Sequence, residues 1–402
     1  MTIHILGAGM AGLSAALRAL EAGAKVVVHE ATAHPGGRAR SFLDPLLNRV
    51  IDNGTHLILG ANRNVLDLIK RVGAESQFLP LVPDGLASFD MKAGTWQEFA
   101  PGRFFPMAQR NLALAADLMR LLTTPRSALL EKVLGASPHF RSLWEPLSLA
   151  ILNTEPRTAS ASLFAGVIRR TLLAGTEACR AYVAARGLSQ GLAEPALARI
   201  RALGGVVNLN SRVMALAGTD SCASIAFKEH LVDLGAGDSV ILALPSWDAA
   251  RLISLPRFET RAILNLHFRL DRPALLSGGR RFAGLLGGSG QWFFCRGDTL
   301  SVTVSAWEEK QGDEARIARI VWSEAQRILE SSPASMPLHR VVVERRATIA
   351  HTPANERLRP PAKTRWSNFF LAGDYTDTGL PCTIEGAVLS GETAARLALQ
   401  SR

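Results

Sequence analysis

Three glycines near the N-terminus, Gly7, Gly9 and Gly12, could hold a phosphate group against the main chain. An apolar strand over residues 3–6 precedes them and an Ala/Leu-rich helix over 13–22 follows, which is the order in which such glycines bind a dinucleotide. Gly7 permits a tight turn, Gly9 lets the main chain approach a pyrophosphate, and Gly12 lets the helix sit close to the strand. The helix N-terminus then presents free N–H groups and the positive end of its dipole.

An acidic residue follows at the position expected to meet a ribose. Glu30 ends the apolar segment 26–30, the second strand of the same unit, and Ala31 comes directly after it. A carboxylate there accepts hydrogen bonds from ribose hydroxyls and favours an adenosine without a 2′-phosphate. Isolated glycines are usually turn glycines, so it is the combination of strand, glycines, helix, strand and acid that predicts dinucleotide binding.

Two further segments could face the same ligand. Gly36-Gly37-Arg38 would bring main chain and a guanidinium fork to a second phosphate or to a ring system. Near the other end, a buried strand stops at Gly373, and Asp374 is placed to accept from a ribityl hydroxyl. The helix that begins at Thr383 would turn its positive dipole end toward the ring and stabilise negative charge on it. The two ends of the chain therefore supply two parts of one site.

These features resemble the FAD-dependent amine oxidase and phytoene desaturase superfamily. Three longer segments resemble one family within it, the hydroxysqualene dehydroxylases, which are squalene-associated flavoenzymes of bacterial hopanoid biosynthesis. The segments are Asp52-Asn53-Gly54-Thr55-His56, Trp144-Glu145-Pro146-Leu147 with Leu152-Asn153-Thr154, and the stretch from Gly373 to Ala387. The sequence departs from the family pattern at Tyr375, where Trp is frequent, and at Cys382, where Ala is frequent.

The resemblance implies that the chain binds FAD noncovalently. A thiol at Cys382 could form a thioether to the flavin ring, but the amine oxidases that do so use a different local sequence. Val213 matches the segment whose valine main chain meets the adenine, although a plain strand end would look the same. The residues expected to contact FAD are Gly7, Gly9, Ala11, Gly12, Glu30, Ala31, Gly36, Gly37, Arg38, Thr55, Val213, Gly373, Asp374, Thr383 and Ile384.

The resemblance also implies a reaction in which reduced FAD replaces the hydroxyl group of hydroxysqualene, a hydrophobic C30 isoprenoid, with hydrogen. Cleavage of an allylic C–O bond needs a proton donor at the leaving oxygen and a dry cavity. The candidate donors are Glu385, His56 and Asp377. Each has a structural alternative: Glu385 could cap its helix, Asp377 could order its turn, and His56 could be packed in the core.

Other functions use the same flavin motifs. A carotenoid-type desaturase or an amine oxidase would run the flavin oxidatively, and a flavin-bearing binding protein would hand squalene to a partner without chemistry. With only two tyrosines in the chain, a paired-aromatic cage for an amine is not evident. Only the substrate-facing segments and the loop at Gly379-Leu380-Pro381 favour the dehydroxylase, and the electron donor for FAD is not indicated by the sequence.

At 402 residues the chain exceeds one ordinary core, so two domains are expected. The fold class is α/β, with a Rossmann-type FAD-binding domain interleaved with an α+β substrate-binding domain. The apolar segments 3–6, 26–30, 206–209, 240–244 and 369–372 should form the strands of the first domain. The expected boundaries are 1–75, 188–255 and 365–402 for the FAD-binding domain and 76–187 and 256–364 for the substrate-binding domain.

Composition constrains partners and location. No run reaches the roughly 18 apolar residues of a spanning helix, and a strand at residue 3 leaves no room for a signal peptide. The four cysteines lie far apart with no Cys/His cluster, so neither a metal site nor disulfides are expected, and the predicted compartment is the cytoplasm. The sequence has no nucleic-acid motif.

A formal charge of +10 suits the anionic inner face of the cytoplasmic membrane, although a general preference for Arg would produce the same charge. The segment 104–134 is the expected contact. It includes an apolar helix over 111–122 with basic flanks, which is typical of an interfacial helix. A core helix that roofs the substrate cavity is the alternative.

Overall fold

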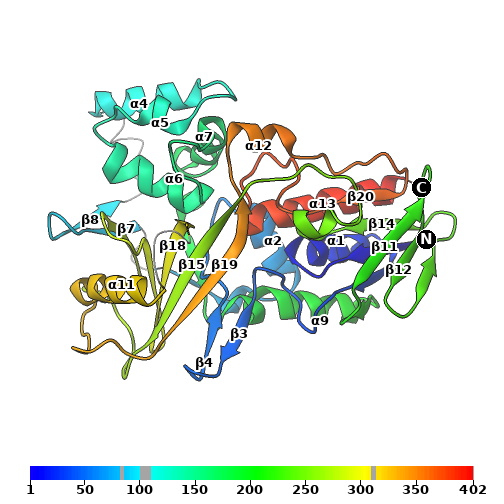
Figure 1. Cartoon of the computed structure of the whole chain (residues 1–402), viewed down its shortest axis with the longest axis horizontal. Coiled ribbons are helices and arrows are strands. Elements are labelled where there is room, and N and C mark those ends of the chain that lie inside the picture. Colours follow the sequence, from blue (N-terminus) through cyan, green and yellow to red (C-terminus); the bar gives the residue numbers. More distant parts are fainter. Residues whose placement is uncertain (82–85, 100–109, 309–313, 402) are drawn as a thin grey trace.

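A computed structural model of the chain describes residues 1–81, 86–99, 110–308 and 314–401. Figure 1 shows an elongated molecule with both termini at the end that carries β11 (Val213–Gly218) and β12 (Cys222–Phe227). The helices α4 to α7 and the strands β7 and β8 lie toward the opposite end. The segments near the two chain ends therefore build the same region of the molecule.

A five-stranded parallel sheet forms the centre of that region, in the order β10-β2-β1-β14-β20. All five strands expected from the apolar segments are confirmed, with one or two residues' difference at their ends. Four of them are short and mostly buried, as expected for parallel strands that helices cover on both faces, whereas the edge strand β10 is partly exposed. The strands are β1 (Thr2–Leu6), β2 (Lys25–His29), β10 (Val206–Asn208), β14 (Ser239–Leu242) and β20 (Phe369–Leu371).

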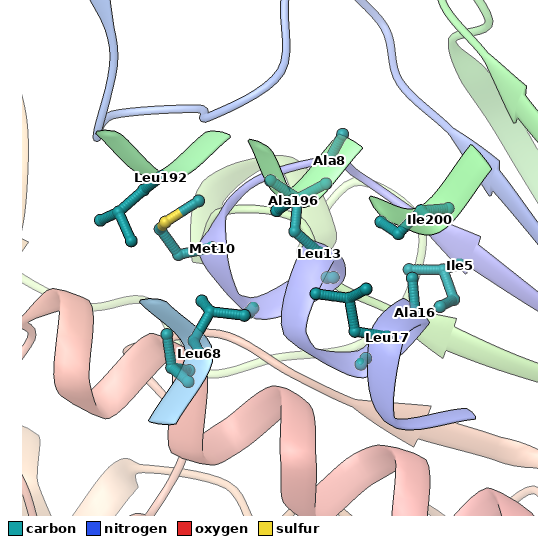
Figure 2. Close-up of a cluster of buried hydrophobic side chains, with 14 of the residues drawn as sticks. Ile5, Ala8, Met10, Leu13, Ala16, Leu17, Leu68, Leu192, Ala196 and Ile200 are labelled. Atoms are coloured by element: carbon teal, nitrogen blue, oxygen red, sulfur yellow. The ribbon is translucent and has the colours of Figure 1, made fainter. Parts of the chain in front are cut away.

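Helix α1 (Met10–Glu21) packs against α13 (Ile384–Gln400), so the first and last helices of the chain lie side by side. Their close approach depends on Gly391, because a Cβ there would lie 2.1 Å from the Ala11 carbonyl oxygen. Leu13 and Leu17 of α1 belong to one buried cluster with residues of α9 (Glu194–Ala202) and α2 (Arg63–Arg71) (Figure 2).

A seven-stranded, mainly antiparallel sheet forms the second large unit, in the order β19-β15-β18-β17-β16-β7-β8. Its strands lie within the two segments predicted for the substrate-binding domain, and it packs against α11 (Glu314–Ile328) around a core of its own. The domain boundaries themselves stay a prediction. The strands are β7 (Leu86–Asp90), β8 (Thr95–Phe99), β15 (Thr260–Arg269), β16 (Phe282–Leu286), β17 (Trp292–Arg296), β18 (Thr299–Trp307) and β19 (His339–Ile349).

A helical cluster adjoins this sheet and has a third core around the fully buried Trp144. The expected helix over 111–122 is α4 (Leu112–Leu122), whose first turn is capped by the Asn111 side chain. The buried Asp117 carboxylate of α4 accepts hydrogen bonds from Trp144 Nε1 and Ser137 Oγ. The other helices of the cluster are α5 (Leu130–Leu134), α6 (Glu145–Leu152) and α7 (Ala161–Arg170).

The structure limits the predicted lipid-facing surface of α4 to one side of the helix. Leu114, Leu118 and Leu121 of α4 are buried in the helical core, whereas Leu112 is 86% exposed and Met119 is 66% exposed. One face of α4 is therefore a core face, and only the other is available to a membrane. Residues 104–109 of the predicted segment lie outside the described residues.

Smaller elements connect these units. The hairpin β3–β4 leads out of the first strand–helix–strand unit, and β5, β9 and β6 form a three-stranded sheet across the predicted boundary at residue 75. Among the described residues, no helix is long and apolar enough to cross a membrane. Their bounds are β3 (Ser41–Asp44), β4 (Arg49–Asp52), β5 (Leu57–Leu59), β6 (Phe78–Pro80), β9 (Ala181–Ala184), β13 (Leu231–Asp233), α8 (Thr176–Cys179), α10 (Ser246–Ala249) and α12 (Pro353–Leu358).

Candidate active site

In the turn between β1 and α1, glycine is favoured at each of the three N-terminal positions for a different physical reason. Gly7 has a φ of +110°, a conformation that L side chains rarely adopt. A Cβ at Gly12 would lie 1.9 Å from the Gly7 carbonyl oxygen, so Gly12 is needed for helix and strand to meet. A Cβ at Gly9 would meet no atom of the described residues within 4 Å and would project into a cavity that Gly9 lines. Protein packing does not require glycine there, but a ligand close to the main chain does.

Glu30 lies on the wall of this cavity next to Ala31. Its carboxylate accepts hydrogen bonds from the Ala8 N–H at 2.8 Å and from the Thr32 N–H at 2.9 Å. These bonds fix the carboxylate at the end of β2, beside the glycine turn. A carboxylate held there can accept from a ribose, as the sequence predicts.

The second glycine loop joins the first directly. The Gly36 N–H donates to the Ala8 carbonyl at 2.8 Å, and Gly9 and Gly36 form an isolated parallel bridge. Gly36 and Gly37 have φ values of +105° and +58°, so the loop needs residues that tolerate the left-handed region. The two glycine loops thus form one continuous main-chain wall of the cavity.

Arg38 links this wall to the C-terminal part of the chain. Its guanidinium donates to Asp374 Oδ1 at 2.7 Å and to the Ala347 carbonyl at 2.7 Å. Burial alone would lower the pKa of Arg38, but the Asp374 carboxylate outweighs burial and the net shift is upward. Both side chains line the cavity, so the pair places a fixed positive and a fixed negative group at its surface.

The opposite wall is the segment that leads from β20 into α13. Thr383 caps α13 by accepting the Gly386 N–H at 3.1 Å, and Thr383 and Ile384 line the cavity. The positive end of the α13 dipole therefore lies at the cavity. Cys382 also lines it, and burial raises the pKa of its thiol well above the ordinary range.

Most residues predicted to contact FAD line this one cavity. Gly12 and Thr55 do not: Gly12 is used for packing, and the Thr55 hydroxyl is buried without a hydrogen-bond partner among the described residues. The sequence did not single out other lining residues, among them Arg212 and Arg251. The predicted residues on the cavity wall are Gly7, Gly9, Ala11, Glu30, Ala31, Gly36, Gly37, Arg38, Val213, Gly373, Asp374, Thr383 and Ile384.

The three candidate proton donors lie in different environments. His56 lines the cavity, whereas Glu385 and Asp377 do not. The Glu385 carboxylate accepts hydrogen bonds from the Asn64 N–H at 3.1 Å, the Asn64 side-chain amide at 2.6 Å and the Val65 N–H at 3.0 Å. Glu385 therefore caps α2 rather than its own helix, and Asp377 lies exposed on the loop before α13.

His56 has a defined orientation. Its Nδ1 lies 2.7 Å from the Gly54 carbonyl oxygen, which can only accept, so Nδ1 carries a proton and Nε2 is left for other partners. His56 is exposed to the cavity that it lines. Desolvation by the surrounding protein lowers its pKa below the usual 6.5, although the Gly54 bond and the Asp52 charge oppose the shift. Asn265, buried in β15, donates to the Asn53 carbonyl at 3.0 Å and so ties the segment before His56 to the seven-stranded sheet.

The cavity has the features that an FAD molecule needs. A glycine whose missing Cβ faces the cavity allows a pyrophosphate against the main chain, and Glu30 and Asp374 provide ribose and ribityl acceptors. Two helix N-termini, of α1 and α13, contribute residues to the wall. Among the described residues, no three His, Cys, Asp or Glu side chains gather as metal ligands would.

Comparison with known proteins agrees with this geometry. The family model described as "Flavin containing amine oxidoreductase" matches residues 10–399. This chain belongs to that family. It is an FAD-dependent oxidoreductase, and FAD is its cofactor.

Within the family, the chain belongs with the hydroxysqualene dehydroxylases. It is 39% identical to the hydroxysqualene dehydroxylase of Rhodopseudomonas palustris, over 99% of this chain and 98% of that protein. It is 38% identical to that of Sinorhizobium fredii, over 99% of this chain and 98% of that protein. Identity to a probable zeta-carotene desaturase of Synechococcus elongatus is 23%, over 100% of this chain and 99% of that protein. The carotenoid desaturases are thus more distant relatives.

Solved structures show the same fold at low sequence identity. An oxidoreductase from Methanosarcina mazei superposes with a TM-score of 0.76 at 15% identity, over 98% of this chain and 100% of that one. Putrescine oxidase superposes with a TM-score of 0.72 at 16% identity, with both chains fully covered. The predicted α/β fold class is confirmed.

Proposed function

We propose that this chain removes the hydroxyl group of hydroxysqualene reductively, yielding squalene and water for hopanoid or triterpenoid biosynthesis. The observation that supports it most is full-length similarity to proteins of that name, in a chain whose cavity is built for FAD. The substrate C–O bond breaks, a C–H bond forms, and one proton joins the leaving oxygen to make water. FAD, bound in reduced form, supplies the hydride.

His56 is the proton donor that we propose. Its Nδ1–H bond to Gly54 holds the ring in one orientation, and Nε2 is the atom left to carry a proton toward the substrate oxygen. Its lowered pKa makes the protonated ring a stronger acid than a histidine with the ordinary pKa of 6.5. Each turnover requires His56 to take up a proton again before the next substrate reacts.

Glu385 and Asp377 fit the role less well. The Glu385 carboxylate already accepts three hydrogen bonds from α2, and a proton donor needs a free O–H instead. Asp377 is exposed and, unlike His56, does not line the cavity, so it is not placed to reach a substrate held there. Both remain candidates that substitution can test.

An amine oxidase function has weaker support in the site. Tyr375 is fully buried and Tyr182 is half-buried in β9, and neither lines the cavity that the flavin residues share. A paired-aromatic cage built from these tyrosines at that cavity is therefore not supported. Desaturation uses the same flavin residues as dehydroxylation, so the direction of electron flow has to decide between the two.

The decisive experiment follows the oxidation state of FAD. Photoreduced enzyme is mixed anaerobically with hydroxysqualene, and we expect the flavin to reoxidise while squalene accumulates in equal amount. Squalene should leave oxidised FAD unchanged. Bleaching of oxidised FAD by a more saturated isoprenoid would instead identify a desaturase. No change in either direction, with lipid still bound, would identify a binding protein.

We further propose that the protein associates peripherally with an anionic membrane on the cytoplasmic side, from which it takes its hydrophobic substrate. Leu112 and Met119 are exposed on α4, and Arg110, Arg120 and Arg126 are exposed nearby in the sequence. An apolar face with basic flanks suits the boundary of an anionic bilayer.

The membrane proposal has its own test. Replacing both Leu112 and Met119 with Ser should reduce cosedimentation with phosphatidylglycerol vesicles and leave the bound FAD unchanged. The matched control is Leu118→Ser, which should lower the melting temperature instead, because Leu118 is buried. Equal vesicle binding by the parent and the double variant would contradict the proposal.

A further inference from the structure

A fully buried guanidinium lies beneath the segment that carries the C-terminal FAD residues. Arg359 follows α12, and its side chain has 0% exposure. Nη2 donates to the carbonyl oxygens of Asp374 at 2.8 Å and Thr376 at 2.6 Å, and Nη1 donates to that of Leu380 at 2.6 Å. Nε adds a longer bond to the Tyr375 carbonyl at 3.4 Å, so one side chain binds four main-chain acceptors along the loop 374–380.

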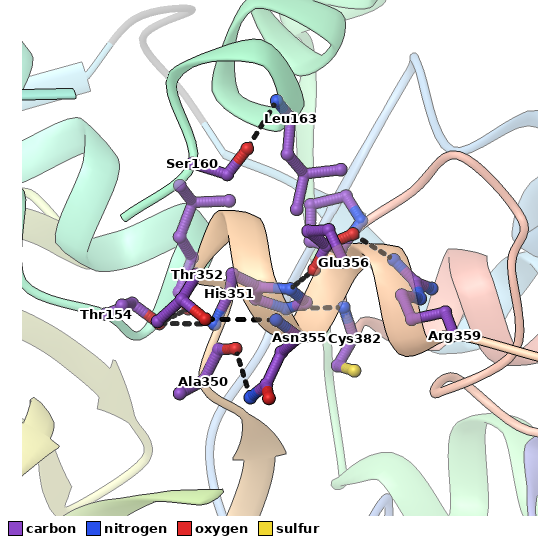
Figure 3. Close-up of polar contacts among 12 residues, drawn as sticks. Thr154, Ser160, Leu163, Ala350, His351, Thr352, Asn355, Glu356, Arg359 and Cys382 are labelled. Carbon is purple, nitrogen blue, oxygen red and sulfur yellow. Dashed lines mark hydrogen bonds and ion pairs between the residues drawn. The ribbon is translucent and has the colours of Figure 1, made fainter. Parts of the chain in front are cut away.

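A buried histidine holds the other end of the same segment (Figure 3). The His351 side chain has 0% exposure, and its Nε2 accepts the Cys382 N–H at 2.9 Å. Its Nδ1 lies 2.7 Å from Glu356 Oε1, so the ring donates there. Because Nε2 is an acceptor and Nδ1 a donor, the hydrogen bonds select one neutral tautomer.

Glu356 links the two groups into one hydrogen-bonded network of His351, Glu356 and Arg359, which we call the relay. Its Oε1 accepts from His351, and its Oε2 accepts from Arg359 Nη1 at 2.9 Å. Burial would raise the pKa of Glu356, but the His351 and Arg359 contacts outweigh burial and lower it. The charges of Glu356 and Arg359 thus balance within the protein, and each polar atom facing the loop has a partner.

The relay holds the segment at both ends of its turn. Asp374, at the first end, directs its carboxylate to Arg38 and the cavity, while its own carbonyl is bound by Arg359. Cys382, at the second end, precedes Thr383, which begins α13. Arg359 therefore binds the Asp374 end of the segment, His351 binds the α13 end, Glu356 links the two, and none of the three lines the cavity.

We infer that His351, Glu356 and Arg359 are positioning residues that hold the segment 374–383 in place for FAD, and so set the affinity and the reduction potential of the bound flavin. The α13 N-terminus stabilises negative charge on the reduced ring only while it points at the ring. Loss of the relay should weaken binding of the reduced form more than that of the oxidised form. This inference concerns the cofactor alone and holds for any substrate.

The test compares Arg359→Met with Arg357→Met. Arg357 lies in the last turn of α12, two residues before Arg359, is exposed, and has no hydrogen-bond or ion-pair partner among the described residues. We expect Arg359→Met to weaken FAD binding by about 10–100-fold, the effect of losing hydrogen bonds from a charged group. The reduction potential of the FAD bound to this variant, measured at saturating FAD, should fall. The fall should be about 30 mV for each tenfold by which binding of reduced FAD is weakened more than binding of oxidised FAD. Its visible spectrum should shift, and Arg357→Met should match the parent in all three measurements.

A purely structural role would lower the melting temperature and leave the spectrum and potential of bound FAD unchanged. That result in a folded Arg359→Met protein would overturn the inference. If Arg359→Met does not fold, Arg359→Lys decides, because an ammonium keeps the charge but cannot reach four carbonyls with the geometry of a guanidinium. Parent-like affinity, spectrum and potential in Arg359→Lys would then overturn it.

Discussion

On the N-terminal side of the FAD cavity the wall is main chain, bridged from Gly9 to Gly36 and shaped by residues that lie close in sequence. On the C-terminal side the wall is a loop held from below by side chains, among them Arg359 and His351, that contribute nothing to its surface. The first wall is determined by which backbone conformations its residues allow. The second is determined by buried polar groups that come from outside the motif.

This difference predicts how each wall fails. A change in the N-terminal wall should act locally, either on the ligand or on the packing of α1. A change beneath the C-terminal wall should leave the cavity surface chemically unchanged and still alter the flavin. Substitutions on the N-terminal side should therefore change FAD affinity alone, and substitutions beneath the C-terminal wall should change affinity together with the electronic properties of the flavin.

The largest expected effect is at Gly9. Gly9→Val should abolish FAD binding and leave the apoprotein folded, because a Cβ there would meet only the cavity. Gly12→Ala should instead destabilise the apoprotein, because its Cβ would lie 1.9 Å from the Gly7 carbonyl oxygen. Overpacking of this kind costs about 1–3 kcal/mol of unfolding free energy. Flavin content and the apoprotein melting temperature check both; an unfolded Gly9→Val protein would contradict the separation.

The second effect distinguishes a proton donor on the N-terminal side from one on the C-terminal side. His56→Gln should slow flavin reoxidation by about 10²–10⁴-fold, the usual contribution of general acid catalysis. In the parent the rate should rise as the pH falls through the pKa of His56, which desolvation places below 6.5, because only the protonated ring can donate. The variant should lose this pH dependence. Stopped-flow reoxidation across pH 5–8 measures both.

Glu385→Gln is the matched substitution on the C-terminal side. It should leave the reoxidation rate near that of the parent and lower stability by about 1 kcal/mol, because Glu385 caps α2. A reoxidation rate reduced a hundredfold or more in this variant, with unchanged FAD content, would make Glu385 the acid. Asp377→Asn is the next candidate if both variants react normally.

The sequence was sufficient wherever local geometry decides the structure. The five parallel strands and the roles of Gly7, Gly9 and Gly12 follow from short-range patterns, and the structure confirms the strands. It was insufficient where a contact spans the chain. Glu385 looks like a residue that caps its own helix, but its partners are Asn64 and Val65.

Other features had no sequence signal at all. Nearly every position of α4 is apolar, so the sequence alone could not show that Leu118 faces a core while Met119 faces outward. Arg359 precedes a proline in an ordinary polar stretch, and nothing in that stretch indicates a guanidinium with 0% exposure. Buried polar residues are chosen by partners that only the folded chain brings together.

The third expected effect concerns the contact that joins the two walls. Arg38→Met should weaken FAD binding by about 2–3 kcal/mol, somewhat below the cost of breaking a fully buried pair, because the Arg38 side chain is 30% exposed. Combined with Asp374→Asn in a double-mutant cycle, it should show a coupling of about 1–3 kcal/mol. Arg40→Met is the control, since Arg40 is exposed and has no ion-pair partner among the described residues. If the losses of FAD-binding free energy in the two single variants add up to the loss in the double variant, the two walls act independently.

The smallest expected effect sharpens the comparison most. Glu30→Gln should weaken FAD binding by about 1–3 kcal/mol, because its carboxylate holds the Ala8 N–H and is the proposed ribose acceptor. Since Glu30 lies on the adenosine side, its loss should leave the visible spectrum and the potential of bound FAD unchanged. Arg359→Met, by contrast, should change both. Titration with FAD, followed by spectra and potentiometry at saturation, compares the two variants directly. A spectral shift in Glu30→Gln equal to that in Arg359→Met would show that the N-terminal wall also sets the electronic properties of the flavin, and the distinction between the walls would then fail.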